Sequence, residues 1–104
     1  MTATLADQAA TLACLANLAV GHPNLPAAYI TTSRFTPREL SVQLDSPGKV
    51  EAWREALGIP AESVFESRIG NRQSLEFRAS AYGVLFHVYA AYLPATVGNT
   101  PQAA

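Results

Sequence analysis

The sequence predicts a two-layer α+β domain in which two helices cover one face of a five-stranded antiparallel sheet. Two segments carry apolar residues at helical spacing, and five others show the alternation or the apolar runs of strands. Their order is helix, two strands, helix, three strands, which is typical of a helix layer packed on a sheet. Within the 104 residues we predict one domain over residues 1–93 and a tail without periodicity over residues 94–104.

The first helix is predicted over residues 5–20. Thr4 and Asp7 have the spacing of a capping box, and Gly21 provides a stop signal. Between them apolar residues recur at three- and four-residue steps, and most other positions are alanine. Cys14 is the single cysteine, so no internal disulfide can form, and we expect it to be a small buried residue.

Two strands and a second helix are predicted next. In residues 28–33, Ala28, Ile30 and Thr32 alternate with Tyr29, Thr31 and Ser33, which predicts a strand. Residues 39–44 alternate strictly between polar and apolar side chains, which predicts a second strand with one solvated face. Pro47 has the position of a first-turn proline in a helix that ends at Gly58. Trp53 lies at the centre of the apolar stripe of this helix, so we predict that it belongs to the core.

Three further strands are predicted over about residues 63–69, 74–79 and 83–92. Charges predict the register of the first two. With residues 70–73 as the loop, Arg68 lies opposite Glu76 and Glu66 lies opposite Arg78. A slip of two residues would instead oppose Glu66 to Glu76, so we expect the first register.

The last predicted strand is apolar on both faces, unlike the second strand. Such a strand is expected at the centre of a sheet, covered on both sides, or within an interface. Following the reversal of chain direction at each connection, we predict the strand order 2-1-3-4-5. A parallel pairing of the second and third strands is the alternative order.

Composition narrows the class of protein. The net charge is -1, so no overall field draws the chain to DNA, RNA or an anionic membrane. The first 33 residues contain no Lys or Arg, so a secretory signal is not expected. No apolar run approaches the roughly 18 residues of a membrane span. We therefore expect a cytoplasmic protein.

Chemistry-bearing motifs are scarce. His22 and His87 are the only histidines, and no Cys, Asp or Glu accompanies either at the spacing of a metal site. No nucleophile motif, acid–base pair or phosphate loop is present, so we predict no metal, no cofactor and no enzymatic activity. With a four-residue loop between the last two strands, His87 would face Glu76 beside Arg68 and make a cross-strand polar contact.

Arginines are the weak candidates for a nucleic-acid surface. They lie in two predicted hairpins: Arg34, Arg38, Arg68, Arg72 and Arg78. Glutamates interleave with them, so the local charge nearly cancels. A solvated, ion-paired sheet face is therefore the preferred interpretation, and nucleic-acid binding is the least favoured function.

Part of the chain resembles a family. The segments 35–44 and 51–58, followed by the strand that starts at Gly83, resemble small uncharacterised proteins of actinobacterial genomes and their mobile elements. The resemblance covers about residues 12–93. That family has no established activity, so the resemblance implies no catalytic residue.

Two functions fit these observations best. The first is a non-enzymatic protein–protein interaction module, a homodimer through the outward side of the last strand, marked by Leu85, His87 and Tyr89. The alternative is small-molecule or peptide binding on the same sheet face, with His87 and Tyr89 as polar groups in an apolar groove. Binding of a ligand would distinguish the alternative from the first function.

Overall fold

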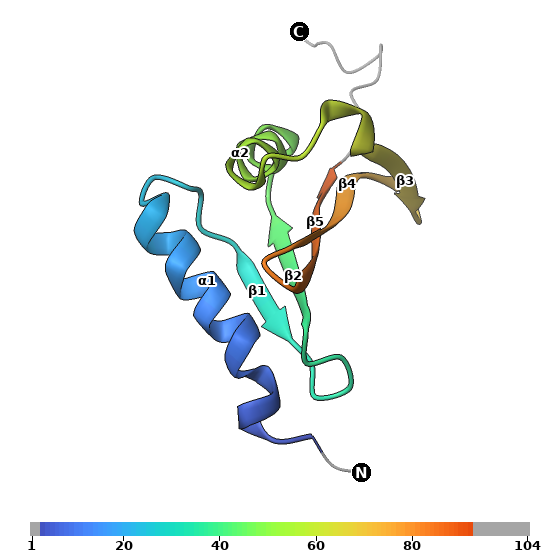
Figure 1. Cartoon of the computed structure of the whole chain (residues 1–104). Coiled ribbons are helices and arrows are strands. Elements are labelled where there is room, and N and C mark those ends of the chain that lie inside the picture. The colour runs from blue at the N-terminus through green and yellow to red at the C-terminus, as the bar shows by residue number, and fades with distance from the viewer. Residues whose placement is uncertain (1–2, 93–104) are drawn as a thin grey trace, which may run out of the picture.

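A computed structural model describes residues 3–92 and confirms the α+β class, with two helices packed on a five-stranded sheet (Figure 1). The predicted tail lies outside the described residues. The elements in chain order are the 3₁₀ turn η1 (Leu5–Gln8), α1 (Ala9–Gly21), β1 (Tyr29–Thr32), β2 (Glu39–Leu44), α2 (Pro47–Leu57), the 3₁₀ turn η2 (Ala61–Ser63), β3 (Phe65–Ile69), β4 (Arg72–Ala81) and β5 (Val84–Tyr92).

The strand order is β1-β2-β5-β4-β3, so the predicted order 2-1-3-4-5 is wrong. The sheet is also not antiparallel throughout, because β2 and β5 pair in parallel. The reason is the apolar character of β5, which places it at the centre between β2 and β4, where both of its edges are paired. The expectation that the last strand can be central is confirmed.

The hairpin between β3 and β4 turns more tightly than predicted. Gly70, with a φ of 62°, begins a two-residue turn, a position where glycine is favoured because other residues rarely adopt positive φ. The turn places Glu66 opposite Leu75 and Arg68 opposite Gln73.

The predicted ion pairs Arg68 with Glu76 and Glu66 with Arg78 are therefore wrong. The observed register differs from the predicted one by three residues, an odd number, and side chains alternate between the faces of a strand. Glu66 and Arg68 consequently lie on the opposite sheet face from Glu76 and Arg78. Turn geometry, and not cross-strand charge, decides the register here.

The hairpin between β4 and β5 also turns with two residues. Tyr82 has a φ of 56° and Gly83 a φ of 74°, as a type I′ turn requires at both positions. The predicted four-residue loop is wrong because β4 continues to residue 81. As a result His87 lies opposite Arg78, not opposite Glu76.

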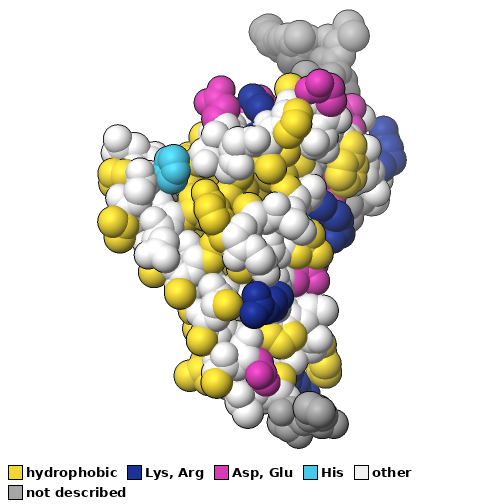
Figure 2. All heavy atoms as spheres, in the orientation of Figure 1, with side chains coloured by type: hydrophobic (Ala, Val, Ile, Leu, Met, Phe, Trp, Pro, Cys, Tyr) yellow, Lys and Arg dark blue, Asp and Glu magenta, His cyan; other side chains and the backbone are white. Residues whose placement is uncertain are grey.

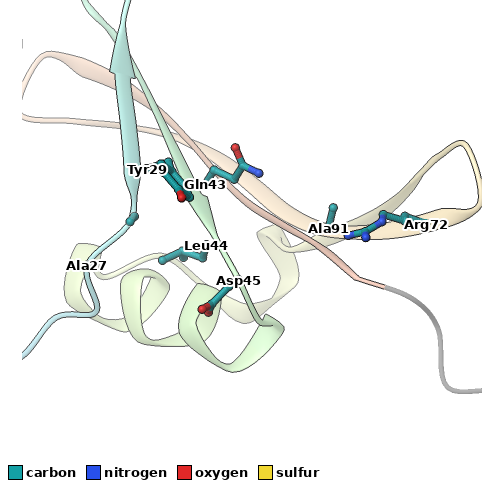
Figure 3. A pocket seen from close by; sticks show the side chains of 8 residues that line it. Ala27, Tyr29, Gln43, Leu44, Asp45, Arg72 and Ala91 are labelled. Atoms are coloured by element: carbon teal, nitrogen blue, oxygen red, sulfur yellow. The ribbon is translucent and has the colours of Figure 1, made fainter.

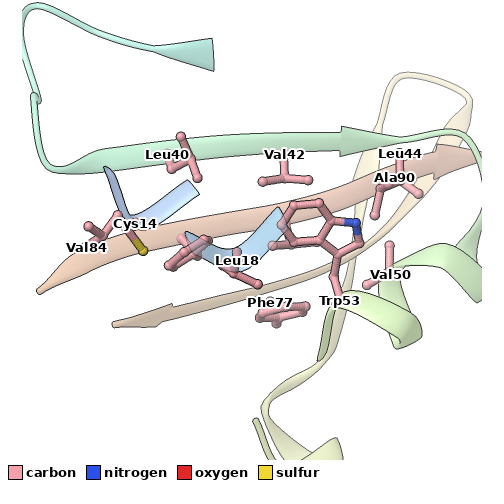
Figure 4. Packing of buried hydrophobic residues seen from close by; sticks show 12 residues of the cluster. Cys14, Leu18, Leu40, Val42, Leu44, Val50, Trp53, Phe77, Val84 and Ala90 are labelled. Carbon is pink, nitrogen blue, oxygen red and sulfur yellow. The ribbon is translucent and has the colours of Figure 1, made fainter. Parts of the chain in front are cut away.

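One face of the sheet, the inner face, packs against both helices (Figure 4). The core between the sheet and the helices contains the buried residues Cys14 and Leu18 of α1, Val50 and Trp53 of α2, and Leu40, Val42, Leu44, Phe77, Val84, Phe86, Val88 and Ala90 of the sheet. Trp53 is only 3% exposed, and its indole Nε1 donates a hydrogen bond to the carbonyl of Pro26 at 3.0 Å. The predictions that Trp53 and Cys14 are core residues are confirmed.

Helix α1 is apolar on both sides. Its start is preceded by the predicted cap, in which the backbone N–H of Thr4 donates to the Asp7 carboxylate at 2.8 Å. Cys14 faces the core, whereas Val20 is 82% exposed. Residues 9–21 contain no charged side chain, and Figure 2 shows apolar side chains along this helix.

Candidate functional site

The outer face of the sheet, which neither helix covers, carries the candidate site. Side chains alternate along β5: Val84, Phe86, Val88 and Ala90 are buried against the helices, and the residues between them point to the outer face. Leu85, His87 and Tyr89 thus lie together on this face, side by side with the outward residues of β2. Leu85 is 38% exposed, and the other two are half-buried.

A buried carboxylate lies at the centre of the outer face. Glu76 is only 7% exposed, and its Oε1 lies 2.8 Å from Nε2 of His87. The hydroxyl of Ser67 donates to the other carboxylate oxygen, and the fully buried Ser74 lies next along the same face of β4. We call Ser67, Ser74, Glu76 and His87 the Glu76 cluster.

The cluster favours the charged form of Glu76. Burial by itself raises the pKa of this carboxyl, but the hydrogen bonds from Ser67 and His87 outweigh burial, so the pKa of Glu76 lies below its ordinary value. The carboxylate is therefore ionised at neutral pH and holds the His87 ring in place. Glu76 is fixed in position by bonds from two neighbouring strands.

Tyr89 extends the cluster towards β2. Its ring stacks on the His87 ring with centroids 4.8 Å apart and an interplanar angle of 25°. Its hydroxyl donates a long hydrogen bond of 3.5 Å to Oε1 of Gln43. Two of the three residues that the sequence marks on this strand are therefore engaged with polar neighbours, and Leu85 is the large apolar side chain left among them.

A groove lies next to Gln43, at the carboxyl end of β2 (Figure 3). Its volume is about 430 Å³, and its lining residues are Ala27, Ala28, Tyr29, Gln43, Leu44, Asp45, Arg72 and Ala91. Tyr29 and Gln43 form one side, and Arg72 lies on the other side beyond Ala91. Tyr29 is 79% exposed, so its ring is available to a ligand. Asp45 is held by Lys49 at 2.8 Å, which lowers its pKa.

The Glu76 cluster lacks the connections of a catalytic relay. In such a relay a base accepts the proton of a nucleophile while a carboxylate orients the base. Here the hydroxyl of Ser67 donates to the carboxylate itself and not to His87. Within residues 3–92, moreover, no group of three or more His, Cys, Asp or Glu could hold a metal ion. The cluster therefore fixes the Glu76 carboxylate and the His87 ring in position on the outer face.

The five candidate arginines do not form one surface. Arg38 donates to the carbonyl of Gly83 at 3.2 Å, and Arg34 lies over the ring of its neighbour Phe35, both at the start of β2. Arg72 lines the groove at the other end of the sheet. Arg78 is on the outer face near Glu39, and Arg68 is on the opposite face of β3. The structure gives no support to a continuous basic strip.

Sequence reasoning assigned no role to Ser67, Ser74 or Tyr29, and it did not place Arg72 at a groove. The signal that could have found the two serines is the turn at Gly70. A two-residue turn there places Ser67 on the same face as Ser74 and Glu76, whereas the predicted register places Ser67 on the opposite face. The groove follows from strand order, which sequence pattern alone did not provide.

The fold and this surface define a small two-layer α+β protein with one open sheet face. No protein-family model, no curated protein and no solved structure matches the chain. The resemblance to actinobacterial proteins therefore stays an expectation. Neither helix within residues 3–92 is long and apolar enough to cross a membrane.

Proposed function

We propose that the protein is a non-enzymatic binding module whose groove on the outer sheet face takes a carboxylate with an adjoining aromatic or apolar body. A free small molecule and the end of a peptide share this chemistry. The observation that carries the proposal is the groove itself, because it places an exposed tyrosine ring and a guanidinium on opposite sides of one hollow.

The dimensions and lining of the groove support this function. Its volume of about 430 Å³ lies within the usual range of small-molecule sites, and apolar and polar groups both line it. Arg72 offers the planar pair of donors that carboxylates bind, and the Tyr29 ring offers a flat apolar wall. Gln43 adds an amide between them, whose Oε1 accepts the long hydrogen bond from Tyr89.

The same face supports self-association less well than the sequence predicts. Leu85 is flanked by His87, which is engaged with Glu76, and by the ion pair of Arg78 with Glu39 at 3.6 Å. A second copy across this strand would remove further water from these charged groups. A small polar ligand in the groove leaves these charged groups hydrated, so we favour ligand binding over self-association for this surface.

The proposal is tested by following backbone amide signals in NMR titrations with two probes. The first is N-benzoylglycine, a free molecule with a ring and a carboxylate, and the second is the peptide acetyl-Phe-Gly with a free carboxyl end. We expect saturable shifts at residues 27–29, 43–45 and 72, and the probe that binds more tightly identifies the source. The matching amides, which lack the carboxylate, should bind at least about tenfold more weakly.

Variants assign the effect to the groove. Arg72→Gln should weaken binding of the acids about tenfold and bring them to the level of the amides. Arg34→Gln is the matched control, since Arg34 is an exposed arginine at the other end of the sheet. Saturable binding that is unchanged by Arg72→Gln, or no binding of either probe, contradicts the proposal.

A further inference from the structure

Strand β3 ends the sheet on one side and has no neighbouring strand beyond it within the described residues. Figure 1 shows it at the rim of the sheet, away from α1. Phe65 is 44% exposed, and Glu66 and Arg68 are exposed as well. An open edge of this kind presents unpaired backbone groups to which another strand can add.

The free backbone groups of β3 belong to Glu66 and Arg68. A two-residue hairpin closes on a hydrogen-bonded pair, here residues 69 and 72, and such pairs alternate along an antiparallel ladder. The pairs of Ser67 with Ser74 and of Phe65 with Glu76 are thus the bonded ones. The N–H and C=O groups of Glu66 and Arg68 therefore point away from β4, towards the open edge.

The charges of β3 are complementary to themselves. Two copies of the strand can pair antiparallel about a two-fold axis centred on residue 66, 67 or 68. Centring on residue 66 opposes Glu66 to itself, and centring on residue 68 opposes Arg68 to itself. Centring on Ser67 opposes Glu66 to the partner's Arg68 twice, and the small Ser67 side chains meet at the axis.

We propose that two copies of this chain associate through β3, antiparallel and centred on Ser67, so that the two sheets become one. Within residues 3–92 neither Glu66 nor Arg68 forms an ion pair in the single chain. The Glu66 carboxylate accepts a hydrogen bond from the Tyr92 hydroxyl at 3.2 Å, which leaves its charge unneutralised, so both charges can pair with those of a partner. Isolated charges on an edge normally discourage pairing. Here the opposite charges of Glu66 and Arg68 disfavour the registers centred on residues 66 and 68 and stabilise the register centred on Ser67.

This contact goes beyond the proposed function and is compatible with it. A two-fold axis through Ser67 that joins the sheets edge to edge leaves both outer faces on the same side, because residues opposite each other in a ladder share a face. Both grooves therefore stay open. The opposite edge, β1, is four residues long and carries no charged side chain, so it offers no comparable register.

Charge reversal tests the pairing. Sedimentation equilibrium from roughly 10 µM to 1 mM should show concentration-dependent dimers of the natural chain. Glu66→Arg alone and Arg68→Glu alone should each weaken association about tenfold or more, because like charges then meet at both positions. An equimolar mixture of the two variants should associate again as a heterodimer, since one strand is then wholly positive and the other wholly negative. The double variant should also recover.

Two controls separate β3 from other surfaces. Leu85→Arg changes the outer face and Val20→Arg changes the exposed side of α1, and both should leave the dimer unchanged. A monomeric natural chain at 1 mM overturns the proposal, and so does monomerisation by either control. Single variants that associate like the natural chain also overturn it. The probe titrations of the groove are expected to give the same result for monomeric Arg68→Glu, so the two proposals can fail independently.

Discussion

His87 bonds to Glu76 diagonally across the ladder and not to the residue that lies opposite it. The residue opposite His87 is Arg78, and the residue opposite Glu76 is Tyr89. The imidazole nevertheless lies 2.8 Å from the carboxylate, because diagonal neighbours on one face of a sheet are within reach of long side chains. The contact that the sequence predicts is thus present, but through a register that it does not predict.

The first prediction concerns the ionisation of Glu76. Its pKa is lowered in the folded chain, so its stabilising effect is complete above the ordinary glutamate pKa, near pH 4, and is lost as the pH falls through the folded value. Glu76→Gln should lower the free energy of unfolding by about 1–3 kcal/mol at pH 5. Urea unfolding should show this difference shrinking towards pH 3.

The control for that experiment is Glu62→Gln, at an exposed position in η2. It should change the free energy of unfolding by less than about half a kcal/mol at either pH. A Glu76→Gln difference that stays constant from pH 5 to pH 3 would mean that the carboxylate charge contributes nothing to folding, contrary to the geometry of the Glu76 cluster.

The second prediction concerns the core under α2. Trp53→Ala should lower the free energy of unfolding by about 3–5 kcal/mol, because it leaves a large cavity and removes the donor to the Pro26 carbonyl. Trp53→Phe keeps much of the volume and should cost less. Chemical denaturation measures both, with Val20→Ala on the exposed side of α1 as the near-neutral comparison. A Trp53→Ala cost within about half a kcal/mol would contradict the packing in Figure 4.

The sequence predicts the elements of this fold well and their arrangement less well. The limits of β2 and α2 and the burial of Trp53 depend on local periodicity and caps, which neighbouring residues determine. The apolar pattern of β5 indicates a central strand, but its neighbours β2 and β4 are chosen by long-range pairing, which no local pattern encodes.

In the candidate site, too, local pattern predicts single strands and long-range pairing decides which residues meet. Strand alternation alone correctly places Leu85, His87 and Tyr89 on the outer face. Bringing Ser67 onto the same face requires the exact length of the turn at Gly70, and assembling the groove requires strands that are distant along the chain. The predicted loop is two residues too long and the predicted register is wrong by three, so the elements stay intact while every cross-strand partner changes.

The third prediction uses the backbone of Tyr82. This residue has a φ of 56°, a left-handed conformation that costs most side chains roughly 1–2 kcal/mol and that asparagine tolerates better. Tyr82 is 73% exposed, so little packing is lost on substitution. Thermal and urea unfolding should show Tyr82→Asn more stable by roughly 0.5–1 kcal/mol and Tyr82→Val less stable. A marked loss of stability in Tyr82→Asn would show that the ring contributes more than the strain.

The fourth prediction tests the register of β3 and β4 through Arg78. Its guanidinium lies 3.6 Å from the carboxylate of Glu39 on the outer face, whereas Glu66 lies on the opposite face of the sheet. A double-mutant cycle to alanine should give a coupling energy of a few tenths of a kcal/mol for Glu39 with Arg78, since the arginine is half exposed, and this coupling should weaken in 1 M salt. The same cycle for Glu66 with Arg78 should give no coupling within about 0.3 kcal/mol. Both cycles share Arg78, so they compare a glutamate on the same face of the sheet with a glutamate on the opposite face. A larger coupling for Glu66 would restore the register with the longer turn.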